Sequence, residues 1–151
     1  MKGLIDFYKH LITTFLEKEL LLNNLHDFFT FHEIVESGYC AKRFINNEEL
    51  YKSFIAVYEN NKIEYIRLSP KSGCIDLSLY ELKEYLNINF SVFNNFREMS
   101  TNFIFKLNEQ REIEFIVYKD IRQKKGILNI YNNGTISENE IYCEELILRY
   151  K

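Results

Sequence analysis

The chain has 151 residues, of which 46% are hydrophobic and 27% charged, with a formal net charge of −3. A chain of this length is typical of one domain and buries about 70% of the surface that its unfolded form exposes. The mildly acidic charge disfavours a general nucleic-acid binder, which needs a basic surface to neutralise phosphates. We therefore expect a single domain over residues 1–151 that does not bind nucleic acid.

The sequence carries no signal for export or membrane insertion. No apolar run approaches the ~20 residues that span a bilayer, and Asp6 and Lys9 interrupt the stretch that would have to be the apolar core of a signal peptide. Cys40, Cys74 and Cys143 lie far apart and form no CxxC motif. An odd number of isolated cysteines is typical of free thiols in a reducing compartment. We therefore expect a cytoplasmic protein without membrane contact.

The N-terminal segment has the periodicity of amphipathic helices. Apolar residues recur at every third or fourth position from Leu4 to Phe15, and charged residues occupy the other side. This spacing predicts a helix over residues 3–22. A less regular apolar set predicts a second, short helix that begins near Asn24 and stops before Gly38.

Two β-rich runs follow, over residues 53–58 and 63–68. They flank Asn60-Asn61, and asparagine tolerates the positive φ angles of a two-residue hairpin turn. Both runs carry apolar residues on both faces, which is typical of strands in the interior of a sheet. The sequence therefore predicts a central hairpin.

The segment IDLSLYELKEYL contains a helix start signal. Ser78 and Glu81 have the spacing of a capping box, and Leu77 and Leu82 have the spacing of a hydrophobic staple. The sequence therefore predicts a helix over residues 79–86.

The segment NFIFKLNEQREIEFIVYKDI alternates apolar and polar residues on both sides of a polar turn. This pattern predicts a hairpin of strands 102–107 and 112–118. We expect its inner row to pack against a helix. That row consists of Phe103, Phe105, Leu107, Ile113, Phe115 and Val117.

The C-terminal segment begins with a predicted strand over residues 127–131, which a turn at 132–134 ends. Ser137 and Glu140 repeat the capping-box spacing, yet the following residues alternate in strand fashion. A helix there would be apolar nearly all round, so a closing strand over residues 141–149 is favoured. Together the elements predict an α+β fold, with N-terminal helices and a mostly antiparallel sheet of four to six strands that carries its helices on one face.

Candidate catalytic and metal-binding groups are few. His26 and His32 each precede a carboxylate, but a separation of six residues suits neither one helix face nor one strand face, and no third ligand lies nearby. His10 fits a surface position on the first helix. No GxSxG, GxGxxG or GxxxxGK motif is present. We therefore expect no metal, no cofactor and no enzymatic activity.

The outer row of the 102–118 hairpin is the candidate site. Glu112 and Glu114 alternate with apolar residues and share a face, with Lys106 near them across the hairpin. One interpretation is a solvated sheet face whose cross-strand ion pair contributes less than ~1 kcal/mol. The other is a protein-binding surface, because Tyr118 and two isoleucines break up the charges. We expect the second, with Glu64 on a neighbouring strand.

In style, the segments FIAVYENNKIEYIRLSP, LSLYELKEYLNINFSVF and NFIFKLNEQREIEFIVY resemble the small cytoplasmic immunity proteins of bacterial polymorphic or contact-dependent toxin systems. The resemblance covers residues 50–120 and rests on an acidic, aromatic-rich hairpin–helix–hairpin without a catalytic motif. It implies a non-enzymatic protein that binds and neutralises one cognate toxin. These families share no diagnostic signature, so no functional residue is carried over.

Two alternatives remain open. The order of elements also suits an NTF2-like cone fold, which encloses an apolar pocket and either binds a small ligand or acts as an enzyme. Such enzymes need a carboxylate or histidine that faces inward, and the inner row of the 102–118 hairpin contains neither. A structural subunit of a larger bacterial assembly would have the same surface as an immunity protein.

Overall fold

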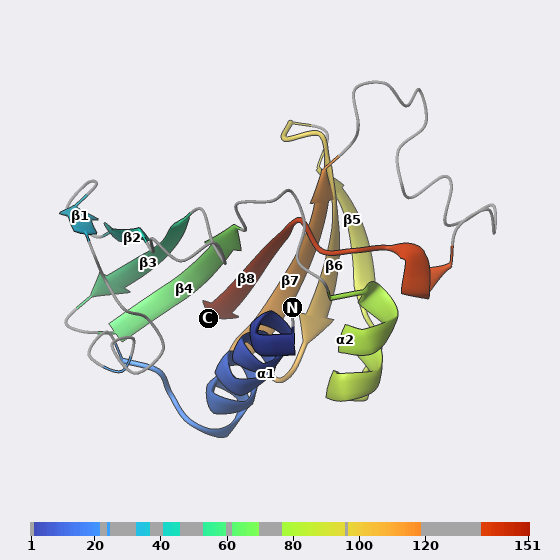
Figure 1. Cartoon of the computed structure of the whole chain (residues 1–151), viewed down its shortest axis with the longest axis horizontal. Coiled ribbons are helices and arrows are strands. Elements are labelled where there is room, and N and C mark those ends of the chain that lie inside the picture. Colours follow the sequence, from blue (N-terminus) through green and yellow to red (C-terminus); the bar gives the residue numbers. More distant parts are fainter. Residues whose placement is uncertain are drawn as a thin grey trace.

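The computed structural model describes residues 2–21, 24, 33–36, 41–45, 53–59, 62–69, 77–95, 97–118 and 137–151. They form an α+β fold built on one antiparallel sheet (Figure 1). Eight strands lie in the order β1-β2-β3-β4-β8-β7-β6-β5. The strands are β1 (Glu33–Glu36), β2 (Ala41–Ile45), β3 (Ser53–Glu59), β4 (Lys62–Ser69), β5 (Ser91–Asn95), β6 (Ser100–Lys106), β7 (Arg111–Tyr118) and β8 (Glu145–Tyr150).

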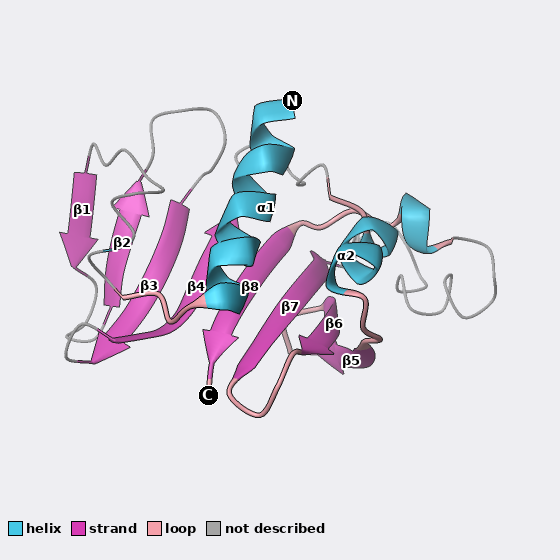
Figure 2. Ribbon diagram, turned by 90° about the horizontal axis from the view of Figure 1, so that it is seen from below, coloured by secondary structure: helices cyan, strands magenta, loops and turns pink. Residues whose placement is uncertain are grey.

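Helices α1 (Lys2–Glu17) and α2 (Leu79–Leu86) lie on the same face of the sheet, as expected (Figure 2). We call this the inner face and the opposite one the outer face. A short 3-10 turn, η2 (Glu138–Glu140), lies beside α2 in both views. Among the described residues, no helix has the length and apolarity needed to cross a membrane.

Helix α1 ends at Glu17, five residues before the predicted end at residue 22. The apolar pattern continues past this point, but the following residues form tertiary contacts and do not continue the helix. The Leu20 amide donates to the Tyr150 hydroxyl at 2.7 Å, and the Leu20 side chain is fully buried. The Arg111 guanidinium donates to the Leu16 carbonyl at 3.1 Å, so a cation from the sheet satisfies the C-terminal end of α1.

The prediction of a second N-terminal helix, from near Asn24 to before Gly38, is wrong at residues 33–36. Residues 33–36 form β1, which pairs with β2 from Glu33–Ile45 to Glu36–Lys42. Ile34 and Val35 are β-branched, and such side chains favour strands over helices. Neither β1 nor β2 was predicted from the sequence.

Helix α2 confirms the predicted helix over residues 79–86. The Ser78 hydroxyl accepts a hydrogen bond from the Glu81 amide at 3.1 Å, and Ser78 has the extended backbone of an N-cap. Leu77 and Leu82 are both buried, as a hydrophobic staple requires. At the other end, Asn87 adopts the left-handed conformation with φ 53°, which ends the helix.

Both predicted hairpins are confirmed. Strands β3 and β4 pair from Ser53–Ser69 to Glu59–Lys62, and both lie inside the sheet rather than at its edge. Strands β6 and β7 pair from Ser100–Tyr118 to Lys106–Glu112.

The C-terminal segment contains both structures that its sequence suggested. The Glu140 carboxylate accepts from the amide and the hydroxyl of Ser137 around η2, and the strand β8 follows. Strand β8 lies between β4 and β7, and it therefore joins the β1–β4 half of the sheet to the β5–β7 half. The predicted strand over residues 127–131 lies outside the described residues.

The inner face of the central strands and the two helices form the core. Phe15 of α1 and Leu82 of α2 are fully buried there. Four phenylalanine rings pack edge-on between α2 and the sheet, with centroid separations of 5.3–5.9 Å, namely Phe90, Phe103, Phe105 and Phe115. Each fully buried aromatic or aliphatic side chain contributes roughly 1.5–3 kcal/mol, and this packing places the outer face on a rigid support.

The sheet is wider than the four to six strands expected. The additional strands are β1, β2 and β5, all short and all at or near an edge. In β5, the sequence SVFNN contains two asparagines and no alternation of apolar with polar residues, so it lacked the pattern of a half-buried strand.

Candidate functional site

The outer face of β4, β8, β7 and β6 carries a layer of charged and polar side chains. Side chains alternate between the two faces along each strand, and residues that pair across neighbouring strands point to the same face. Cα pairing aligns Arg67 with Ile147 and Ile147 with Glu114, and it aligns Arg149 with Glu112. The side chains that form the layer, which we call the outer-face network, are Arg67, Ser100, Asn102, Glu112, Glu114, Tyr118, Glu145, Arg149 and Lys151.

Glu145 is the centre of one half of the network. Its carboxylate lies 2.7 Å from the Arg67 Nε, although that N–H does not point at the oxygen well enough to form a hydrogen bond. The Tyr118 hydroxyl donates to the other carboxylate oxygen. Burial of Tyr118, together with this hydrogen bond to an anion, raises the pKa of the phenol well above its usual range. Tyr118 is therefore a neutral donor at physiological pH.

Glu112 and Glu114 form the other half with Arg149. The guanidinium of Arg149 reaches both carboxylates, at 3.6 Å and 3.4 Å respectively. Lys151 lies 3.0 Å from the second oxygen of Glu112. Asn102 donates to Glu114 at 2.8 Å and accepts from the Ser100 hydroxyl at 2.7 Å. Every carboxylate in this half therefore has at least two polar partners.

The alternative interpretation of Glu112 and Glu114, as part of a solvated sheet face, does not describe their surroundings. Glu112 is only 6% exposed and Glu114 only 8%. Lys106 lies across the hairpin from Glu112, as expected, and is exposed. The ion pairs of the two glutamates run instead to Arg149 and Lys151. The physical reason is the position of β8, which brings two cations alongside the β7 glutamates.

On this face the cations are more exposed to solvent than the glutamates are. The side chains of Arg67 and Arg149 are each 38% exposed and that of Lys151 is 49% exposed. Three carboxylates lie below them and balance their charge. Two buried isoleucines, Ile116 and Ile147, lie in the same face. The surface is thus a layer of paired charges that covers two isoleucines, and it is not an acidic patch.

The predicted site residues do not all come together. Glu112 and Glu114 share one cation, and Tyr118 joins the network through Glu145. Glu64 is exposed at an irregularity in the β3–β4 pairing, and β8 separates its strand from β7. It takes no part in the outer-face network.

Sequence reasoning missed the network residues on β8 and β4. Glu145, Ile147 and Arg149 alternate in the segment EELILRYK and therefore share a face. That alternation was a usable signal. It did not identify the partner strands, because strand neighbours distant in sequence cannot be read from a local pattern.

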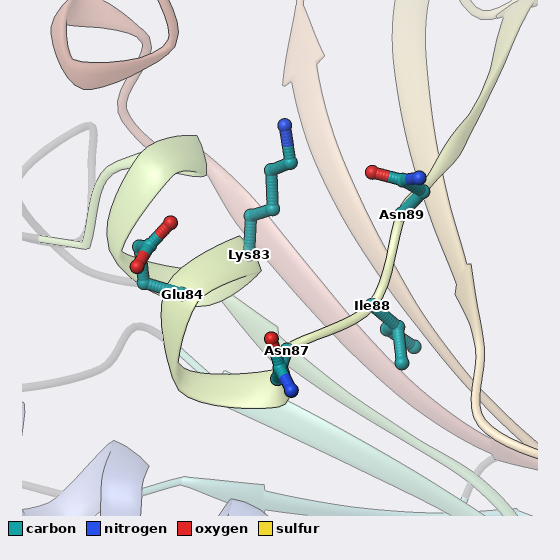
Figure 3. Close-up of a pocket in the computed structure, with 5 residues that line it drawn as sticks. All are labelled: Lys83, Glu84, Asn87, Ile88 and Asn89. Carbon is teal, nitrogen blue, oxygen red and sulfur yellow. The ribbon is translucent and has the colours of Figure 1, made fainter.

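A small pocket lies at the C-terminal end of α2, on the opposite side of the sheet from the outer-face network. It has a volume of about 260 Å³ and is lined by Lys83, Glu84, Asn87, Ile88 and Asn89. Figure 3 shows Lys83 and Glu84 on the helix and Asn89 on the segment that leads into β5. Lys83 pairs with Glu138 at 3.4 Å, so its charge is already balanced.

The described part of the chain contains no candidate metal site. No group of three or more His, Cys, Asp or Glu side chains is placed to hold an ion there. His10 is exposed on α1, whereas His26 and His32 lie outside the described residues. Cys143 is a fully buried free thiol, and burial raises its pKa far above the usual range. Cys143 is therefore a protonated packing residue; Cys40 and Cys74 lie outside the described residues.

Comparison with known proteins gives a likeness of fold. No protein-family model and no curated protein matches the chain. Among solved structures, the chain is similar to YjgB, a DUF4309 family protein from Bacillus subtilis subsp. subtilis str. 168. The TM-score is 0.58 at 12% sequence identity, and the match covers 97% of each chain. An identity this low establishes a shared architecture over nearly the whole chain and nothing about activity.

Proposed function

We propose that this chain is a non-enzymatic protein-binding domain, and that it acts as a bacterial immunity protein that binds and neutralises a cognate toxin in the cytoplasm. The outer face is the binding surface. The proposal rests on the outer-face network and on the resemblance of residues 50–120 to immunity proteins.

The observation that carries the proposal is the pairing of every charge in the network. Arg67, Arg149 and Lys151 reach solvent, and buried carboxylates hold each of them in place. Binding normally costs about 0.5–1.5 kcal/mol for each long side chain that becomes ordered. Cations that are already held lose less freedom when a partner docks. A polar layer whose cations are already ordered suits a specific protein interface.

Among the predicted contact residues, we expect Tyr118 and Glu64 to touch a partner directly. Tyr118 is half-buried, which suits an aromatic anchor whose remaining surface a partner covers. Glu64 is exposed and charged, which suits a steering role at the rim. Glu112 and Glu114 act indirectly. They position the guanidinium of Arg149 and the ammonium group of Lys151, which we expect a partner to contact.

An enzyme or small-ligand cone fits the described residues less well. The inner face that would line an apolar ligand cavity is filled by the phenylalanine cluster, and Phe103, Phe105 and Phe115 are fully buried. The three network glutamates are each engaged by cations or donors. Their carboxylate oxygens are therefore already occupied by partners within the chain.

The test is a growth assay with the product of the neighbouring gene. We expect that gene to encode a protein with a toxin-like C-terminal domain. Bacteria that express this domain should stop growing, and co-expression of the chain should restore growth. Tyr118→Ala should weaken that protection, whereas Tyr80→Ala, which alters an exposed tyrosine on α2, should protect fully. No growth defect, or full protection by Tyr118→Ala at equal protein levels, would contradict the proposal.

A further inference from the structure

The outer face of the sheet separates its charges by depth. Cα pairing places Lys106 opposite Glu112 and Glu112 opposite Arg149, so these three residues form one row across β6, β7 and β8. The side chains of the three network glutamates are each no more than 10% exposed. Within the network and its neighbour Lys106, the charged side chains that are more than a third exposed are all cations. We call them the outer-face cations, namely Arg67, Lys106, Arg149 and Lys151.

The hydrogen-bonding groups that the charged side chains of this face still offer are donors. Both carboxylate oxygens of each network glutamate already have a partner within the chain. Arg67 reaches Glu145 only through Nε, so its two terminal nitrogens have no hydrogen bond among the described residues. Guanidinium and ammonium groups donate hydrogen bonds and cannot accept them. A partner that docks on these cations must therefore supply the acceptors.

The balance of charge on this face favours anionic acceptors. The four outer-face cations face three glutamates, so one positive charge has no counter-charge in the network. Lys106 carries it, since this exposed side chain has no ion pair in the described part of the chain. A guanidinium binds a carboxylate through two parallel hydrogen bonds, and the terminal nitrogens of Arg67 form the required fork. Carboxylates are therefore the acceptors that fit this face.

A protein surface fits these cations better than a nucleic acid does. Nucleic acid presents an unbroken run of phosphates, and the formal net charge of −3 opposes its approach. The glutamates beneath the cations also weaken the positive field that such a polyanion needs. Lys106 and Arg149 are two strand spacings apart, about 10 Å. Separate acidic side chains on a folded surface can meet cations at such intervals without lying over the glutamates.

We propose that the partner presents an acidic surface to the outer face, with carboxylates that bind Arg67, Lys106 and Arg149. This inference rests on the proposed function, which makes the outer face the binding surface, and it adds the chemistry of the partner. In the complex, Arg67 and Arg149 lie between a carboxylate of this chain and one of the partner, so the docked acids have counter-charges. Exposed Glu64 repels the same acids and thereby favours one docking position.

Lys106 is the residue to change, because its substitution leaves no network glutamate without its cation. The probe is the purified toxin-like domain encoded by the neighbouring gene. Lys106→Glu should slow its association and weaken its affinity about tenfold, and the effect should shrink as the salt concentration rises. Lys106→Gln should act in the same direction but less. Lys9→Glu, which makes the same charge change at an exposed residue of α1, should bind as the native chain does.

A charge exchange identifies the partner's carboxylates. The acidic residues of the toxin-like domain are changed to lysine one at a time, and each variant is tested against Lys106→Glu. At least one of them should restore binding, because the exchanged charges attract again. Restoration by none of them would overturn the proposal, since the group that meets Lys106 would then not be a carboxylate of the partner.

The remaining outcomes separate this inference from the proposed function. Unchanged or faster association of folded Lys106→Glu, together with weakened binding by Tyr118→Ala, would overturn the acidic partner surface and leave the outer face as the binding surface. A single-stranded oligonucleotide that binds the native chain but not Lys106→Glu would also overturn it, because the occupant would then be a nucleic acid. A toxin-like domain that does not bind the native chain would overturn both proposals.

Discussion

Both faces of the central strands contain buried side chains, yet different interactions bury them. On the inner face, Phe115 and Leu146 are fully buried among apolar side chains. On the outer face of the same strands, Glu114 is 8% exposed and Glu145 is 6% exposed, within a network of ion pairs and hydrogen bonds. One pair of strands therefore carries a hydrophobic core on one side and a paired polar layer on the other.

The two faces should respond differently to amino-acid substitution. Apolar packing depends mainly on volume, so the inner face accepts other side chains of similar size. A paired charge depends on its partner, and a buried carboxylate that loses its cation has no substitute. The outer face also depends on register, because Arg149 meets Glu112 and Glu114 only while β8 keeps its pairing with β7. A slip of one residue would turn Arg149 into the core.

The largest effect should come from opening the inner face. Phe115→Ala leaves a cavity among fully buried rings and should lower the free energy of unfolding by about 3–5 kcal/mol. Phe93→Ala, which shortens an exposed ring on β5, should change it by less than about 0.5 kcal/mol. Urea denaturation of both variants measures the difference. Equal losses for the two substitutions would mean that Phe115 is not a core residue.

A smaller effect should come from breaking the outer-face network. Arg149→Met keeps most of the side-chain length but leaves Glu112 and Glu114 without their shared cation, and we expect a loss of about 1–2 kcal/mol because Arg149 is partly exposed. Arg97→Met, at an exposed arginine without an ion pair in the described part of the chain, should be neutral within about 0.5 kcal/mol.

A combined variant sharpens the same prediction. Glu112→Gln and Glu114→Gln, added to Arg149→Met, remove the charges that the first substitution left unpaired. The triple variant should therefore be more stable than the sum of its single changes predicts. Strict additivity in chemical denaturation would show that these three side chains do not act as one network.

Local sequence patterns predicted the inner face well. The alternation around Phe103 and Phe115 identified a hairpin and the side of it that packs into the core. The spacing of Ser78 and Glu81 identified the start of α2, because a cap is a contact between residues three apart. In both cases the interacting residues lie close together in the sequence.

The outer face could not be predicted in the same way. The burial of Glu112 depends on Arg149 and Lys151, which lie far along the chain and arrive through the pairing of β8 with β7. Likewise, the apolar residues of the 24–38 segment fit a weak helical pattern, whereas pairing with β2 determined the structure of residues 33–36. Non-local strand pairing overrides local preference at such positions.

Binding kinetics with the purified toxin domain test the central claim, that the outer face binds a partner protein, most directly. We expect Tyr118→Ala to raise the dissociation rate by about tenfold or more, because it removes an aromatic anchor, while Glu64→Lys should mainly change the association rate and its dependence on salt. Tyr80→Ala, on the helical side, should match the native chain, and circular dichroism should show that all three variants remain folded. Native rate constants for both Tyr118→Ala and Glu64→Lys in folded protein would contradict the account.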